Sequence, residues 1–98
     1  MTTVHEPRLR RGLILLAIYE QYPGFLNDAV VNRIMGPLYA DDVKELGRDL
    51  AYLVECELVE ERSDRVGRAS IRSFKLTTGG VDVAQGSVKH PGVHIEQV

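Results

Sequence analysis

The sequence predicts a mainly α fold with a small β-hairpin, which belongs to the α+β class. Three stretches between residues 8 and 57 carry apolar residues at helical spacing, with proline and glycine between them. After Leu58 the helical spacing ends, and residues 71–76 alternate with a period of two, which is typical of paired strands. The chain has 98 residues, which is room for one hydrophobic core.

The first predicted helix runs from Arg8 to about Gln21. Pro7 suits its first position, because the N–H that proline lacks would have no partner there. Tyr22-Pro23-Gly24 ends the helix. The segment RLRRGLILLAIYEQ is apolar on nearly every side, so we expect protein to surround this central helix.

The second predicted helix begins after Asn27 or Asp28, either of which can accept hydrogen bonds from the N–H groups of the first turn. It ends at Gly36-Pro37. Val30 and Val31 are β-branched and leave a strand as the alternative, but the cap and the Gly-Pro stop favour a short helix. The residues expected on its inward stripe are Ala29, Val30, Ile34 and Met35.

The third predicted helix, from Asp42 to about Glu57, is the most clearly amphipathic segment. Asp41 is expected to cap it, and acidic residues in its first turn complement the helix dipole. Residues placed at 100° intervals form one apolar stripe. Its members are Val43, Leu46, Leu50, Leu53 and Val54, and we expect the first four to be buried.

A hairpin and a short helix complete the predicted fold. Leu58–Arg62 and Ser70–Leu76 are the expected strands, with a turn over Ser63–Ala69 and with Phe74 and Leu76 pointing inward.

Thr77 is expected to cap a last helix from Thr78 to about Gln85, which Gly79-Gly80 weakens. We therefore expect one domain over residues 1–86. Residues 87–98 form a C-terminal tail that is either mobile or tied down by a partner.

Three helices followed by a two-stranded hairpin and a short C-terminal helix form the layout of a winged helix-turn-helix. The stretch DLAYLVECELVEE resembles the end of the third helix and the first wing strand of winged-helix regulators, with Leu50, Leu53, Leu58 and Val59 at the matching apolar positions. LTTGGVDVA resembles the L-T-x-x-G pattern that closes the wing. Glu57 departs from the pattern, because related domains often have glycine there. The junction therefore either avoids positive φ or carries strain.

A closer resemblance is to the small, ArsR-like winged-helix proteins of Mu-like phages and prophages. Those chains share RLILLxxLYxxPGxLND, matched here by RRGLILLAIYEQYPGFLND. They close with L-T-x-x-G-x-D-V-A-x-G and a PGV tail, matched by residues 76–86 and 91–93. The resemblance implies the winged-helix fold and, by analogy of fold, transcription regulation.

Two segments of the chain carry net charges of opposite sign. Residues 41–57 hold six acidic and two basic side chains, a net charge of −4, which argues against tight DNA reading by the third helix. Residues 62–75 hold five basic side chains and one acidic one, a net charge of +4 on the wing. The alternative explanation of the positive charge on the wing is that it only keeps the hairpin soluble and discourages pairing of its edges. Arg8, Arg10 and Arg11 extend the basic surface if they lie on the wing's side.

These patterns support two hypotheses. The first is a DNA-binding transcriptional regulator of phage type, a homodimer that contacts double-stranded DNA mainly through its wing. Its candidate contacts are Arg62, Arg65, Arg68, Arg72, Lys44 and Arg48. The second is a protein–protein interaction module that binds a phage or host protein through the acidic face of the third helix, without DNA. Its candidate contacts are Asp41, Glu45, Tyr52 at the exposed centre, and Glu55.

Several other classes are not expected. The longest apolar run, Leu13–Tyr19, is far shorter than the ~20 residues of a membrane span, and no signal-peptide cleavage pattern follows it. A single cysteine, Cys56, excludes an internal disulfide and a Cys-rich zinc site and fits the cytoplasm. His90 and His94 cannot share a helix face, because Pro91-Gly92 lies between them.

The chain carries no pattern typical of catalysis. It has no phosphate-binding glycine loop and no nucleophile with a spaced base. His5, the remaining histidine, completes no metal-ligand pattern with the others. We therefore expect a protein that is not an enzyme, with no cofactor and no metal.

Overall fold

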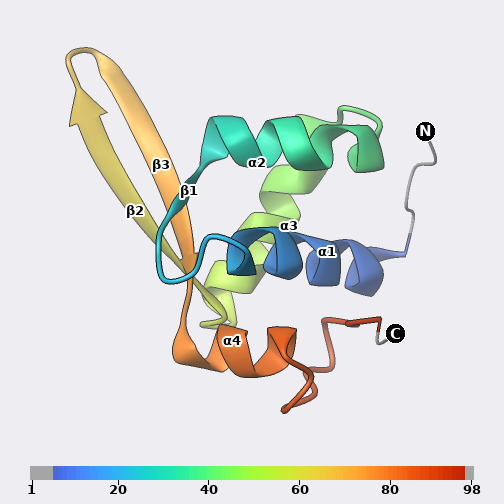
Figure 1. The fold of residues 1–98 in the computed structure, drawn as a ribbon. Coiled ribbons are helices and arrows are strands. Elements are labelled where there is room, and N and C mark those ends of the chain that lie inside the picture. Colours follow the sequence, from blue (N-terminus) through green and yellow to red (C-terminus); the bar gives the residue numbers. More distant parts are fainter. Residues whose placement is uncertain (1–5, 97–98) are drawn as a thin grey trace.

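The computed structural model describes residues 6–96, so His5 and the two ends of the chain lie outside the described residues. The helices are Pro7–Tyr19 (α1), Asp28–Met35 (α2), Val43–Glu55 (α3) and Thr78–Ala84 (α4), with a 3-10 turn at Gly36–Tyr39. The strands are Leu26–Asn27 (β1), Val59–Val66 (β2) and Ala69–Leu76 (β3). The helix α1 contacts α2, α3, α4 and β3, as expected of a central helix (Figure 1).

The helices begin where side chains can accept hydrogen bonds from their first N–H groups. Asn27 caps α2 and Thr77 caps α4, both as predicted. The predicted cap of α3 is wrong by one residue: Asp42, not Asp41, accepts a hydrogen bond from the N–H of Glu45, at 3.1 Å. The physical reason is the sharp reversal before α3, where Asp41 lies in the left-handed region at φ 60°.

The sheet has three strands, whereas the sequence predicted two. The order is β1-β3-β2, and β1 pairs antiparallel with β3 through Leu26 opposite Phe74. The wing is also longer than predicted, because only Gly67 and Arg68 form its turn and Val66 pairs with Ala69. Gly67 lies at φ 62°, the positive φ that a type II′ hairpin turn requires at its first central position.

The core lies where α1 and α3 meet the sheet. Leu46, Leu50, Leu53, Phe74 and Leu76 are all buried, as predicted. The described residues include no helix long and apolar enough to cross a membrane.

The predicted inward stripes need two corrections. Val43 is 62% exposed, because it is the first residue of α3 and lies at the edge of the stripe. In α2 the buried residues are Val31 and Met35, whereas Ala29 and Ile34 are exposed. The helix is therefore rotated relative to the predicted stripe, and its outer face includes residues assigned to the core.

The junction between α3 and β2 has a positive φ, which is the strained one of the two conformations that the sequence left open. Glu57 lies at φ 60°, where a residue with a Cβ is disfavoured. The hydroxyl of Thr77 donates a hydrogen bond of 2.6 Å to the carbonyl oxygen of Glu57. This contact, from the residue that also caps α4, holds the junction in its left-handed conformation.

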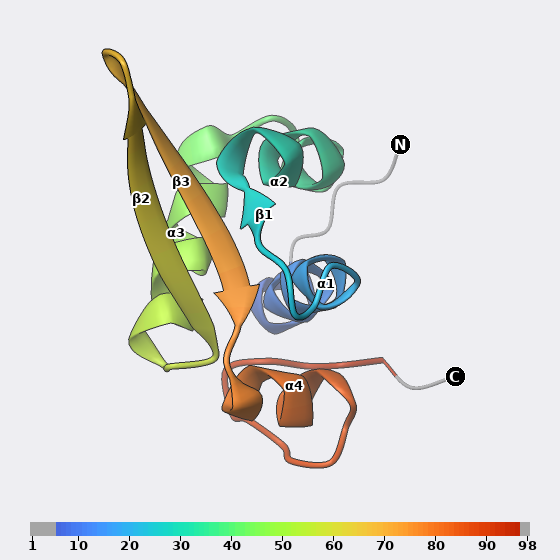
Figure 2. The ribbon, with the colours of Figure 1, turned by 60° about the vertical axis from the view of Figure 1, so that its left-hand side comes forward.

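The C-terminal tail is tied down by its own chain. Residues 89–96, which we call the strap, run back beside α1 (Figure 2). The N–H of His94 donates to the carbonyl oxygen of Arg8 at 3.0 Å, and Arg11 donates to the carbonyl oxygen of Gly92 at 3.2 Å. A Cβ at Gly12 would overlap the carbonyl oxygen of His94, so glycine is required where the strap crosses α1.

Two substitutions on α3 test this packing. Leu50→Ala should lower the free energy of unfolding by about 2–5 kcal/mol, because it opens a cavity in the core. Val43→Ala is the matched control on the same helix and should change it by no more than about 0.5 kcal/mol. Urea denaturation measures both values. Equal effects of the two substitutions would contradict the placement of α3.

Candidate nucleic-acid interface

One acidic residue of α3, Asp49, is buried among cationic and hydroxyl groups. Its side chain is 4% exposed and accepts a hydrogen bond from Nε of Arg11 at 3.0 Å. The hydroxyl of Tyr39 donates to its second oxygen, and Nε of Arg10 lies 3.5 Å from that oxygen. A buried carboxylate is tolerated only when its charge is paired in this way. We call Asp49, Arg10, Arg11 and Tyr39 the Asp49 cluster.

A second acidic residue of α3 is also neutralised from α1. Glu45 accepts a hydrogen bond of 3.0 Å from Nη2 of Arg10, whose side chain is only 10% exposed. The other oxygen of Glu45 lies 3.3 Å from Nη1 of Arg48. Arg10 and Arg11 therefore point into the protein and do not extend a basic surface, and Glu45 is not a free acidic contact.

The outward face of α3 therefore carries fewer free acidic side chains than the count of acidic residues in this helix indicates. Asp49 is inside, Glu45 is paired, and Asp42 caps the helix. The residues that face outward along the middle of the helix are Lys44, Gly47, Arg48 and Ala51, which we call the α3 face. Its two charged side chains are cationic, and the exposed acids Asp42 and Glu55 lie at the two ends of the helix. The inference that the charge of this helix argues against tight DNA reading stays a prediction: two of the six acids that it counted are paired with arginines of α1, and the other four are exposed.

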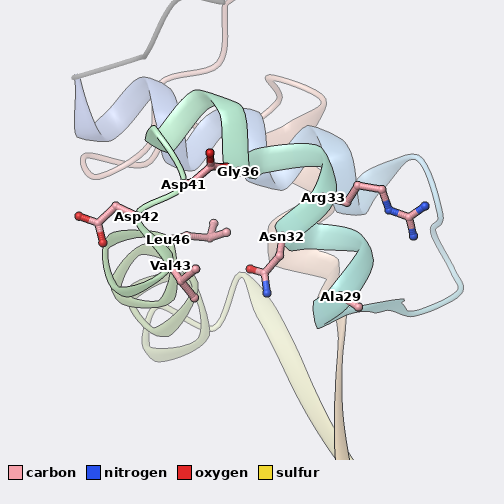
Figure 3. A pocket seen from close by; sticks show the side chains of 8 residues that line it. All are labelled: Ala29, Asn32, Arg33, Gly36, Asp41, Asp42, Val43 and Leu46. Atoms are coloured by element: carbon pink, nitrogen blue, oxygen red, sulfur yellow. The ribbon is translucent and has the colours of Figure 1, made fainter.

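A groove of about 370 Å³ lies between α2 and the start of α3 (Figure 3). Its lining residues are Ala29, Asn32, Arg33, Gly36, Asp41, Asp42, Val43 and Leu46. In Figure 3, Arg33 extends from α2 into solvent, and Asn32 and Val43 project from the two sides of the groove. Asn32 and Arg33 were not among the residues that the sequence predicted for a site. Had Val31 and Met35 been assigned to the core, Asn32 and Arg33 would have been expected on the outer face of α2.

The predicted wing residues divide into two groups. Arg62 lies 3.0 Å from Asp64 and packs over the ring of Phe25 at 4.2 Å, and Arg72 lies 2.7 Å from Glu61. Arg65 and Arg68 form no ion pair with any residue between 6 and 96. Arg68 lies in the turn, and Arg65 pairs with Ser70 near it. We call these two arginines the wing tip.

Of the four residues of the alternative hypothesis, Asp41 and Glu55 are exposed, and Glu45 and Tyr52 are half-buried. Tyr52, expected at the exposed centre, is half-buried because the strap covers it: a Cβ at Gly92 would overlap its hydroxyl group. The guanidinium of Arg11 lies 4.0 Å from the centre of the Tyr52 ring. Asp41 lies in the turn before α3 and Glu55 ends the helix.

The described residues offer few other reactive or metal-binding groups. Cys56 is a free, half-buried thiol. No three of the histidine, cysteine and acidic side chains between residues 6 and 96 gather closely enough to hold a metal ion.

Comparison with known proteins finds a likeness of fold. No protein-family model matches the chain, and no curated protein matches its sequence. The chain is similar to a solved structure of Bacillus subtilis PadR in complex with operator DNA, at 15% identity and a TM-score of 0.58 over 88% of this chain. It spans about half (51%) of that PadR chain. The likeness confirms the winged-helix fold, while the ArsR-like and phage-type resemblance stays a prediction.

The Asp49 cluster predicts a dependence of stability on alkaline pH. Burial, and then the hydrogen bond to Asp49 and the charge of that carboxylate, raise the pKa of Tyr39 above its ordinary value of 10.0. The stability that the neutral phenol contributes is therefore fully present below pH 10. It is lost as pH rises above 10, because the unfolded chain ionises first.

Urea denaturation between pH 9 and pH 12 tests this dependence. Tyr39→Phe should cost about 1.5–3 kcal/mol at neutral pH, because a charged acceptor loses its donor. It should also remove a decline of up to about 1.4 kcal/mol per pH unit above pH 10. An unchanged slope in the variant would show that Tyr39 does not carry the effect.

Proposed function

We propose that this chain is a DNA-binding transcriptional regulator and not an enzyme, and that it binds double-stranded DNA through the α3 face and the wing tip. The observation that carries the proposal is the separation of charge on folding. Two acids of α3 are neutralised by arginines of α1, while Lys44 and Arg48 remain outward. The phosphates of DNA attract such exposed cations whatever the base sequence of the duplex.

The shape of the α3 face suits the major groove. That groove is about 12 Å wide and admits one helix, provided that the helix can approach the base edges. Gly47 has no side chain and Ala51 only a methyl group, so the middle of the α3 face lies close to the helix backbone. Lys44 and Arg48 lie beside them. Asn32 and Arg33 lie on the adjacent outer face of α2 and suit contacts to phosphate or sugar.

The wing tip suits a second contact. The β2–β3 hairpin projects beyond the helices (Figures 1 and 2), and its turn carries Arg68, which forms no ion pair within residues 6–96, with Arg65 close by. Arginine at such a tip binds phosphate or enters a narrow minor groove. Arg62 and Arg72 contribute less, because each would have to leave a carboxylate partner.

The similar fold of a protein solved with operator DNA supports this function. We further propose a homodimer of phage type, located in the cytoplasm. Two copies would present two α3 faces and two wing tips, and a dimer of this kind binds half-sites about one helical turn of DNA apart. The phage context rests on the sequence resemblance alone.

Replacing both tip arginines tests the wing contact. Arg65→Ala with Arg68→Ala should weaken binding to every duplex tested, because phosphate contacts do not depend on sequence. The slope of log affinity against log salt should become shallower by roughly one to two units per chain. Fluorescence anisotropy with a random-sequence 20-bp duplex at several salt concentrations measures both quantities.

The matched control removes the same charge elsewhere. Arg8→Ala with Lys89→Ala takes two exposed cations from α1 and the strap, away from the proposed contacts. This variant should keep most of the affinity. An equal loss in the two double variants would refute the wing contact. A parent protein that does not bind DNA at about 50 mM salt would refute the function.

A further inference from the structure

Arg48 occupies the middle of the α3 face in a held position. Its side chain is 77% exposed, and Nη1 lies 3.3 Å from one oxygen of Glu45. The other oxygen of Glu45 is bound by Arg10, which is fixed inside the protein. Because Arg10 holds Glu45, the carboxylate orients one side of the Arg48 guanidinium. Its other N–H groups remain available to a ligand.

Gly47, next to Arg48, has no structural explanation inside the domain. It lies within α3, where glycine weakens a helix, and apart from its chain neighbours and the backbone of its own helix no atom lies within 4 Å of the position a Cβ would take. By contrast, a Cβ at Gly12, Gly80 or Gly92 would overlap a neighbour. The missing side chain at Gly47 therefore matters outside the fold, where it lets the helix backbone approach a ligand.

We propose that Arg48 reads a guanine in the major groove, and that Glu45 and Arg10 position it for that contact. The inference rests on the proposed function and deepens it. A guanidinium donates two parallel hydrogen bonds to O6 and N7 of guanine, a pattern that no other base presents there. Close approach at Gly47 brings Arg48 within reach of the base edge, and Ala51 lies one turn later beside the same groove.

Lys44 has a different role on the same face. Its ammonium group is a point charge without the planar fork of arginine, and the described residues supply it with no ion pair that would orient it. Lys44 therefore contributes affinity through phosphate, without selecting a base. The two cations predict different mutant phenotypes.

The test begins with selection of preferred sites from 20-bp duplexes whose central 12 bp are random. The guanine common to the selected sites is then replaced by 7-deazaguanine, which lacks the N7 acceptor. The parent protein should lose about 2- to 13-fold in affinity, the range expected for one of the two hydrogen bonds of the bidentate contact. Arg48→Ala should be indifferent to the replacement, whereas Lys44→Ala should bind more weakly but stay sensitive to it.

Gly47→Ala tests the close approach. The added methyl group meets nothing inside the protein, so the melting temperature should rise by roughly 2–8 °C while the affinity for the selected site falls. Gly79→Ala is the matched control, since Gly79 is an exposed glycine in another helix, with ordinary contacts at its Cβ position. It should raise the melting temperature and leave binding unchanged.

Glu45→Gln tests the positioning. It should lower the preference for the guanine site over the same site with adenine, without weakening binding to random duplexes. A purely structural role of Glu45 would lower both affinities together and leave their ratio unchanged.

Two sets of results would overturn the inference. Selected sites without a fixed guanine, or equal sensitivity to 7-deazaguanine in the parent and in Arg48→Ala, would refute base reading and leave DNA binding in place. A parent protein without affinity for any duplex at about 50 mM salt would refute the proposed function, and the inference with it.

Discussion

Asp49 carries a negative charge inside the protein, and much of the structure depends on how that charge is paired. Moving a carboxylate out of water costs several kcal/mol, so its partners must be in place when the domain folds. Those partners are Arg10 and Arg11 of α1 and Tyr39 of the turn before α3. Loss of one of the two arginines weakens the pairing of this buried charge and should cost up to about 3–5 kcal/mol. The cluster thereby fixes the central helix against α3.

The same pairing separates the two sides of α3. On the inner side, Arg11 also donates to the strap at Gly92 and stacks on Tyr52, so this side is covered by the chain itself. On the outer side, with Asp49 and Glu45 paired, Lys44 and Arg48 face solvent along the helix, and the exposed acids Asp42 and Glu55 lie at its two ends. Internal ion pairs thus leave two cations exposed between the acidic ends of this helix.

Local signals in the sequence predicted the order of the helices, the hairpin and the buried Leu50 and Phe74, because caps and apolar periodicity act over a few residues. The α3 face could not be predicted in this way. The arginine that binds Asp49 is 38 residues distant in the chain, so no local pattern shows that the acid turns inward. Likewise β1 has only two residues, too few to show a period.

The most direct test of the account is a map of the DNA-contacting residues in solution. Backbone amide chemical shifts of the ¹⁵N-labelled protein would be followed while a random 16-bp duplex is added. We expect the largest changes at residues 44–51 of α3 and 65–68 of the wing, with little change in the strap. Changes centred on the strap and α4, with α3 and the wing tip unaffected, would contradict the account.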